Sequence, residues 1–149
     1  MTRRAEAADA AAIAELTRRA YAKWVAVIGR EPLPMQIDYA EALARHRFDL
    51  IERDGRLVGL IETVVDGDFL LIVNVAVDSA TQRQGLGAEL LGLAERLAGE
   101  AKLAGLRLYT NARFAANIRF YTRLGFVTER EAALNGGVAV YMTKRLVPH

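Results

Sequence analysis

One segment of the chain, residues 77–88, reads VDSATQRQGLGA, and the rest of the fold is arranged around it. An apolar, β-branched run from Phe69 to Val77 precedes it, and leucines and alanines at helical spacing follow from Glu89. The sequence therefore predicts a strand, a polar loop and the N-terminus of a helix. Such a turn presents free backbone N–H groups and a positive helix dipole, which together favour a phosphate. Gly85 and Gly87 would let that ligand approach the backbone without a Cβ atom in the way.

Three phosphate-binding patterns can be compared with this segment. The P-loop pattern requires Gly-Lys-Ser/Thr, which is absent, and the dinucleotide-binding pattern requires a third glycine where residues 88–90 read Ala-Glu-Leu. The pattern that fits is Gln/Arg-x-x-Gly-x-Gly/Ala, with Gln82, Gly85 and Gly87 at its defined positions. Here the chain resembles the GNAT superfamily of acyl-CoA N-acyltransferases, in which this loop holds the pyrophosphate of coenzyme A. On the loop alone, the alternative is a pair of glycines that merely end a strand and begin a helix.

A second motif, residues 117–126, reads NIRFYTRLGF and resembles the GNAT pattern Asn-x-x-Ala/Phe-x-x-Tyr-x-x-x-Gly-Phe, slightly recast. Asn117 and Tyr121 are four residues apart, so they share one face of a helix. The two motifs occur in the expected order, about thirty residues apart, with a helix and a strand predicted between them. On both motifs together, the chain is identified as a member of the GNAT superfamily.

The resemblance implies one α/β domain over residues 1–149 with the GNAT fold, a mixed central sheet of about six to seven strands flanked by about four helices. Residues 30–34 contain two prolines and are expected to be irregular. The strand at 106–110 should run parallel to that at 69–77, joined by a right-handed crossover. Hydrophobic periodicity predicts strands at 2–5, 48–53, 56–65, 69–77, 106–110, 126–133 and 138–145, and helices at 9–27, 37–45, 87–103 and 115–124.

Composition limits the other possibilities. The 20 basic and 18 acidic side chains give a net charge of +2, which is too even for a nucleic-acid-binding protein despite a pI near 9.1. There is no cysteine for a disulfide or a thiolate nucleophile, and His46 and His149 cannot form a zinc site, so no metal is expected. No apolar run has the length of a membrane span, and the N-terminus lacks a signal-peptide core. We therefore expect a cytoplasmic protein, monomeric or homodimeric, with neither nucleic acid nor a membrane as its partner.

The resemblance implies acetyl-CoA as the co-substrate. In the family a backbone N–H at the end of the strand before the loop polarises the thioester carbonyl, and by position this is Val75 or Ala76. Gln82 stands where arginine is common, and Phe120 stands where alanine is usual, which would alter the packing near the pantetheine arm. The coenzyme A site implied by the resemblance consists of Val75, Ala76, Val77, Gln82, Arg83, Gln84, Gly85, Leu86, Gly87, Ala88, Asn117, Phe120 and Tyr121.

Acyl transfer to an amine requires a neutral nitrogen, a donor to the developing oxyanion and a proton for the leaving thiolate. Tyr121 is the candidate acid, and a core tyrosine that packs the helix against the sheet is the alternative. Asn117 could bind the pantetheine amides or only cap its helix. Residues 70–73 contain no glutamate, so the base is assigned to Glu62, which could instead face solvent, or to a water ordered by Asn74.

The acceptor side of the cleft is expected along the segment that joins the first two helices. Aromatic side chains there could form a pocket wall or simply bury the first helix, and a charged pair could face the substrate. The sequence thus predicts an N-acetyltransferase that transfers an acetyl group from acetyl-CoA to the primary amine of a small molecule by direct attack. A protein or peptide N-acetyltransferase and a non-catalytic acyl-CoA sensor are the alternatives. The predicted acceptor site consists of Tyr21, Trp24, Arg30, Glu31, Met35 and Asn111, the last of which could otherwise cap a turn.

Overall fold

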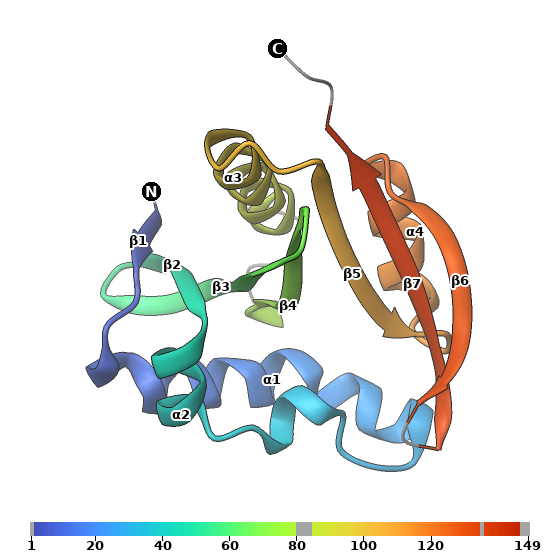
Figure 1. Ribbon diagram of the computed structural model, residues 1–149. Helices are drawn as coiled ribbons and strands as arrows, with labels where there is room; N and C mark the ends of the chain where they lie inside the picture. Colours follow the sequence, from blue (N-terminus) through green and yellow to red (C-terminus); the bar gives the residue numbers. More distant parts are fainter. Residues whose placement is uncertain (1, 80–84, 135, 147–149) are drawn as a thin grey trace.

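The computed structural model describes residues 2–79, 85–134 and 136–146, and its elements follow the predicted order (Figure 1). The predicted α/β class is confirmed, with four α-helices and a mixed sheet among the described residues. The strands are β1 (Thr2–Arg4), β2 (Arg47–Arg53), β3 (Arg56–Asp66), β4 (Phe69–Val77), β5 (Gly105–Asn111), β6 (Val127–Leu134) and β7 (Gly137–Arg145). The helices are α1 (Ala10–Ile28), α2 (Tyr39–Arg45), α3 (Leu86–Glu100) and α4 (Ala115–Arg123), with short 3-10 helices η1 (Ala7–Asp9) and η2 (Leu33–Gln36).

The seven described strands form one sheet in the order β1-β2-β3-β4-β5-β7-β6. Neighbouring strands are antiparallel except β4 and β5, which are parallel because α3 carries the chain back between them. The predicted parallel pair is therefore confirmed. The turns from β2 to β3 and from β3 to β4 each contain a glycine with positive φ, Gly55 at 74° and Gly67 at 60°.

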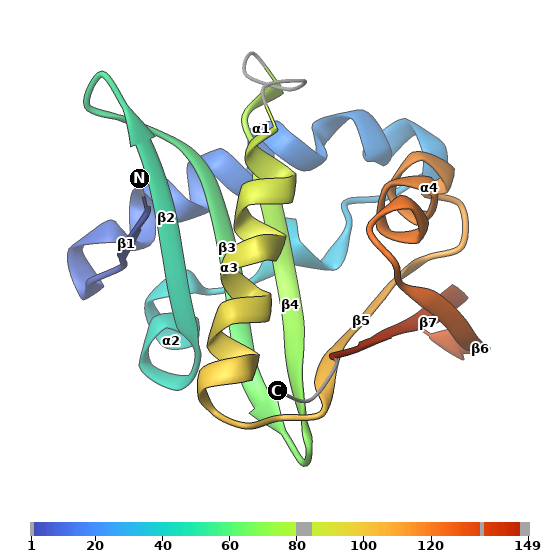
Figure 2. The ribbon, with the colours of Figure 1, turned by 90° about the horizontal axis from the view of Figure 1, so that it is seen from above.

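Helices cover both faces of the sheet, and each face has its own hydrophobic core (Figure 1 and Figure 2). On one face α1 and α2 pack over a cluster that includes Ile13 and Leu50. On the other face α3 packs over a cluster that includes Ile61 and Leu90, and Tyr121 of α4 joins it. The central strands are therefore buried on both sides, as the unbroken apolar run of β4 predicts.

An extra residue in β4 interrupts the regular pairing of the sheet. Glu62 of β3 lies opposite Asn74, but the next residue of β3 lies opposite Ile72, so Val73 is the extra residue. Because side chains alternate along a strand, one additional residue moves everything after it to the opposite face. Ile72 accordingly belongs to the core under α3, whereas Ala76 belongs to the core under α1 and α2.

The strands β4 and β5 separate at the same point. Their parallel pairing joins residues 69–72 to residues 105–108 and does not continue along 73–77 and 109–111, all of which are described. Figure 2 shows β5 diverging from β4 toward α4. Because α3 follows β4, the opening between the two strands lies beside the N-terminus of α3.

The helix α3 ends at Glu100 rather than near residue 103. Two other segments differ from the predicted boundaries for physical reasons. Residues 33–36, in part predicted to be irregular, form η2, and Pro34 fits its first turn because the missing N–H needs no partner there. The helix α2 begins at Tyr39 rather than at residue 37. The side chain of Asp38 accepts hydrogen bonds from two backbone N–H groups of the first turn and so sets this start.

Candidate functional site

A groove of about 400 Å³ lies between the end of β4, the start of α3 and α4. The helix α3 begins after Gly85, whose φ of 76° is left-handed and favours glycine. The first intrahelical hydrogen bond joins Glu89 N to Gly85 O at 3.0 Å, so the N–H groups before Glu89 are available to an anion. Three residues of the predicted coenzyme A site, Gln82, Arg83 and Gln84, lie outside the described residues. The others all line the groove: Val75, Ala76, Val77, Gly85, Leu86, Gly87, Ala88, Asn117, Phe120 and Tyr121.

Aromatic side chains form one wall of this groove. A Cβ atom at Gly87 would lie 3.0 Å from Cζ of Phe120, so glycine keeps the first turn of α3 open beside that ring. Trp24 of α1 also lines the groove and stacks on Phe114, with ring centroids 4.4 Å apart. The Nζ atom of Lys23 lies 5.2 Å from the Trp24 ring. Free N–H groups, a nearby cation and apolar rings fit the pyrophosphate and the pantetheine of coenzyme A.

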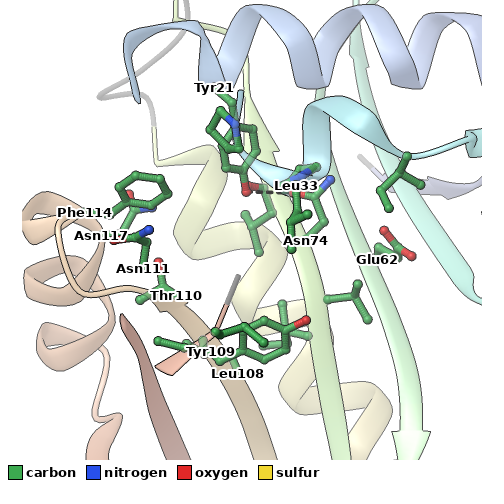
Figure 3. Close-up of a pocket in the computed structure, with 18 of the residues that line it drawn as sticks. Tyr21, Leu33, Glu62, Asn74, Leu108, Tyr109, Thr110, Asn111, Phe114 and Asn117 are labelled. Carbon is green, nitrogen blue, oxygen red and sulfur yellow. Dashed lines mark hydrogen bonds between the residues drawn. The ribbon is translucent and has the colours of Figure 1, made fainter. Parts of the chain in front are cut away.

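A second cavity, of about 250 Å³, lies beside the bulge of β4 (Figure 3). Its walls come from α1 and the segment 28–37, from β3, β4 and β5, and from the hairpin of β6 and β7. Most of its lining side chains are apolar, and a few polar groups face inward, which is the usual composition of a small-molecule site. The polar residues, besides four tyrosines, are Arg30, Glu62, Asn74, Thr110, Asn111 and Asn117.

The groove and the cavity meet at four residues that line both of them. These are Tyr21 of α1, Val75 of β4, and Asn117 and Tyr121 of α4. The shared residues come from both sides of the opening between β4 and β5. A group bound in the groove can therefore contact a group bound in the cavity at this junction.

The backbone N–H of Val75 is directed toward the opening between β4 and β5. Asp78 donates its N–H to the carbonyl of Val58 in β3 at 2.8 Å. Along an antiparallel strand, the N–H groups of successive residues point alternately toward and away from the neighbouring strand. The N–H groups of Asn74 and Ala76 therefore point toward β3, and the N–H of Val75 points away from it. Of the two residues predicted to polarise the carbonyl, Val75 has the matching direction.

Tyr121 lines both the groove and the cavity, and most of the residue is buried. The residue is 9% exposed, and its ring contacts those of Phe120 and Phe126 at centroid distances of 5.4 Å and 5.7 Å. The packing role that the sequence offered as the alternative is thus present. Burial raises the pKa of the Tyr121 hydroxyl to about 12, so the group stays protonated and can donate at neutral pH.

Glu62 faces the cavity from β3, with 5% of its side chain exposed. Its Oε2 lies 2.6 Å from Nδ1 of His46, the residue that ends α2 and is 28% exposed. Burial raises the pKa of the Glu62 carboxyl above its usual value, and the hydrogen bond to His46 opposes part of that rise. The solvent-facing alternative is wrong, because Glu62 shares its sheet face with Leu60, which packs under α1 and α2.

Asn74 is held by a chain of hydrogen bonds, part of which is drawn in Figure 3. The hydroxyl of Tyr21 donates to Oδ1 of Asn74 at 2.8 Å, and Nδ2 of Asn74 donates to the hydroxyl of Tyr39 at 3.4 Å. Tyr39 in turn donates to the carbonyl of Pro34 at 2.6 Å. Burial raises the pKa of Tyr39 to about 12 and that of Tyr21 well above its usual value, so both remain donors at neutral pH. These hydrogen bonds connect the cavity wall at η2 to the bulged strand β4.

Half of the predicted acceptor residues line the cavity, namely Tyr21, Arg30 and Asn111. Arg30 follows α1 and reaches the hairpin of β6 and β7, where a Cβ atom at Gly136 would lie 3.0 Å from its Nη1. Asn111 accepts the backbone N–H of Arg113 at 2.9 Å, so the turn-capping role offered as its alternative is present as well.

The other predicted acceptor residues lie elsewhere. Trp24 lines the groove beside α3, and the described lining residues of the two cavities include neither Glu31 nor Met35. The carbonyl of Glu31 accepts a hydrogen bond from Nε2 of Gln36 at 2.7 Å. The segment is thereby folded so that residues 33, 34 and 37 face the cavity instead.

His46 and Phe114 contribute to the site and were missed from the sequence. Phe114 is apolar and has the pattern of an ordinary packing residue. His46 had a usable signal, because pairing β2 with β3 outward from their turn brings it close to Glu62.

Two features are absent from the part of the chain that the structure describes. No helix there is both long and apolar enough to cross a membrane. No group of three or more His, Asp or Glu side chains is placed there to hold a metal ion.

Comparisons with known proteins bear on the same residues. The model of the acetyltransferase (GNAT) family matches residues 11–126, and no curated protein matches the chain. The crystal structure of PaiA N-acetyltransferase from Thermoplasma acidophilum, in complex with coenzyme A, has a TM-score of 0.84 at 19% identity, with 98% of each chain covered. The ribosomal-protein-S18-alanine N-acetyltransferase from Escherichia coli has a TM-score of 0.76 at 25% identity, covering 97% of this chain and 94% of that one. Nourseothricin acetyltransferase has a TM-score of 0.62 at 26% identity, covering 68% and 65%.

Proposed function

The chain belongs to the acetyltransferase (GNAT) family and is an acetyl-CoA-dependent acetyltransferase, and we propose that its acceptor is the primary amine of a small molecule. The observation that carries this proposal is the meeting of groove and cavity at Tyr21, Val75, Asn117 and Tyr121. A thioester held in the groove and an amine held in the cavity would meet there, which supports direct attack. The chain has no cysteine that could form a covalent acyl intermediate.

Glu62 is assigned as the base that prepares the amine. A free alkyl amine has a pKa of about 10.4 and is therefore an ammonium ion at neutral pH, without a lone pair for attack. The raised pKa of Glu62 makes its carboxylate a stronger base than a surface glutamate. It takes one proton from the ammonium group and leaves a neutral nitrogen. Asn74, directly opposite Glu62 in the sheet, orients the amine or a bridging water through its fixed amide.

Val75 and Tyr121 are assigned to the bond-making and bond-breaking steps. The nitrogen attacks the carbonyl carbon, a C–N bond forms, and the oxyanion accepts the N–H of Val75. The C–S bond then breaks, the nitrogen loses its second proton, and the sulfur gains one. A thiol has a pKa of about 8.5, so a hydroxyl with a pKa of about 12 gives up its proton only as another replaces it. Tyr121 therefore passes a proton to the sulfur while the proton from the nitrogen restores its hydroxyl.

A contact at the edge of the cavity supports a small acceptor over a long peptide. The guanidinium of Arg30 packs against the hairpin of β6 and β7 at Gly136, and Figure 1 shows the end of α1 beside that hairpin. An extended peptide that crossed between the end of α1 and the hairpin would have to displace this contact. Arg30 lines the cavity, which supports its assignment as the group that binds a carboxylate of the acceptor. A protein N-terminus is the second candidate, favoured by the 25% identity to the S18-alanine N-acetyltransferase.

A panel of acceptors tests the proposal. Thiol release from acetyl-CoA is measured with amino acids, polyamines, aminoglycosides, aryl amines and short and long peptides. We expect turnover with one of the small amines, and a raised KM for carboxylate-bearing acceptors in Arg30→Ala at unchanged acetyl-CoA affinity. Arg18→Ala is the control, because Arg18 is exposed on α1 and is not among the described lining residues. Turnover of long peptides together with inactivity toward every small amine would overturn the proposal.

A further inference from the structure

His46 contacts Glu62 from outside the cavity. Its Nδ1 lies 2.6 Å from Oε2 of Glu62, yet His46 is not among the described residues that line the cavity. Its side chain is 28% exposed, against 5% for that of Glu62, which Figure 3 shows at the cavity wall. The imidazole therefore holds the carboxylate from the side away from the acceptor.

The chemistry of the pair defines where the proton lies. A carboxylate only accepts hydrogen bonds, so Nδ1 of His46 carries the hydrogen whenever Glu62 is ionised. This bond occupies Oε2 of Glu62 and leaves Oε1 for the acceptor. A charge-assisted bond of this kind is stronger than one between neutral groups, so it favours the ionised form that acts as a base.

The backbone sets the position of His46 on both sides. Its N–H donates to the carbonyl of Ala42 at 2.9 Å and so closes α2, and its φ of −124° and ψ of 158° are already extended. The strand β2 begins at the next residue, where Arg47 pairs with Thr63, the neighbour of Glu62. The imidazole is thus delivered to Glu62 by the register of two paired strands.

Among the described residues, the other groups that face Glu62 are neutral. Tyr21 from α1 and Tyr39 from α2 interact with it electrostatically, and burial raises the pKa of each, so both stay uncharged. Asn74 lies opposite it in β4, and the opposite position in β2 is a phenylalanine. His46 is the described residue whose ring nitrogen lies within hydrogen-bonding distance of this carboxylate.

We propose that His46 is a positioning residue for Glu62, donating Nδ1–H to Oε2 so that the carboxylate stays ionised and presents Oε1 to the amine. The inference rests on the proposed role of Glu62 as the base. The proton of the ammonium group passes to Oε1, while His46 keeps its own. The carboxylic acid then returns its proton to water, and the pair is restored for the next turnover.

Direct titration of Glu62 tests the inference without any acceptor. The signal of its carboxyl carbon is followed by NMR in protein labelled with ¹³C at the glutamate carboxyls and is assigned through Glu62→Gln. His46→Ala removes the donor and should raise the titration midpoint by roughly one to two pH units. His46→Asn is the matched control, since its amide N–H can replace Nδ1–H, and its midpoint should stay near that of the parent. An unchanged midpoint in His46→Ala overturns the inference.

The pH dependence of turnover separates this role from a purely structural one. With the best acceptor of the panel, the acidic limb of kcat in His46→Ala should move to higher pH by the same amount, while the KM for acetyl-CoA is unchanged. An equal loss of kcat at every pH would mark a structural role and contradict the inference. If Glu62→Gln is fully active, the proposed base is wrong while the titration result stands. If Glu62→Gln is inactive and His46→Ala keeps the parental profile, the inference on His46 alone is wrong.

Discussion

Gly87 and Phe120 fit together only because position 87 has no side chain, since a Cβ atom there would lie 3.0 Å from Cζ of the Phe120 ring. Gly87 belongs to the first turn of α3 and Phe120 to α4, so the contact joins the two helices across the proposed coenzyme A groove. The two motifs that the chain shares with its family thus meet in space. The side chain that fits at position 87 depends on the size of the side chain at position 120.

Enlarging Gly87 should therefore weaken the binding of acetyl-CoA. Gly87→Glu adds bulk and a negative charge beside the proposed pyrophosphate site, and we expect calorimetry to detect no binding by a folded protein. Gly87→Ala should weaken binding about fivefold or more, because the Phe120 ring must move. The added substitution Phe120→Ala should restore part of that loss.

The matched control is Gly99→Ala, near the other end of the same helix. A Cβ atom there meets nothing within 4 Å, so its acetyl-CoA affinity should equal that of the parent. Parental affinity in Gly87→Glu would show that the groove is not the coenzyme A site.

Tyr121→Phe should lower kcat while leaving the KM for acetyl-CoA near its parental value. The substitution keeps the buried ring and removes the proton donor, and general-acid catalysis contributes roughly 10²- to 10⁴-fold in rate. Steady-state thiol release provides the measurement. Tyr141→Phe is the control, because Tyr141 lies in β7 outside the described lining residues of both cavities. A turnover number equal in Tyr121→Phe and the parent would remove Tyr121 from the mechanism.

Glu62→Gln should abolish the acidic limb of the pH–rate profile. The base is active when ionised, and its pKa is raised by burial, so the parental rate should rise through a pH above the usual glutamate range of about 4.3. The variant lacks a group that titrates there and should be slow at all pH values below the range where the amine itself loses its proton. The exposed Glu129→Gln should keep the parental profile. Superimposable profiles of Glu62→Gln and the parent would leave solvent water as the base.

The same substitution should affect stability with a defined sign. The pKa of Glu62 is higher in the folded state than in the unfolded state. Its contribution to the free energy of unfolding is therefore fully present below about pH 4.3 and is lost as the pH rises through the folded-state pKa. Relative to the parent, Glu62→Gln should therefore gain free energy of unfolding as the pH rises through that window. Urea titrations at several pH values measure the difference. A gap between the two proteins that is constant with pH would contradict burial as the cause of the raised pKa.

Much of the fold and part of the site could be predicted from the sequence. Strand, loop and helix around Gly85 and Gly87 involve residues that are neighbours in the chain, so their spacing alone indicates the geometry. The pairing of Asn117 with Tyr121 on one face of α4 is likewise a matter of helical spacing. The acceptor residues were predicted less well, because the fold of the segment around η2 decides which of its side chains face the cavity. Arg30 lines the cavity, whereas Glu31 does not.

The sequence by itself therefore determined the order of the elements, the proposal of a phosphate-binding turn and the family, all of which depend on local patterns. Only the tertiary structure decided which polar groups converge. The extra residue Val73 turns Asn74 to the face of α1 and α2 and frees the N–H of Val75 beside the opening of the sheet. The pairing of β2 with β3 then brings His46 to Glu62. Side chains alternate between the two faces of the sheet along every strand. Which residues point to which face depends on the pairing with the neighbouring strand, and a single inserted residue exchanges the two faces.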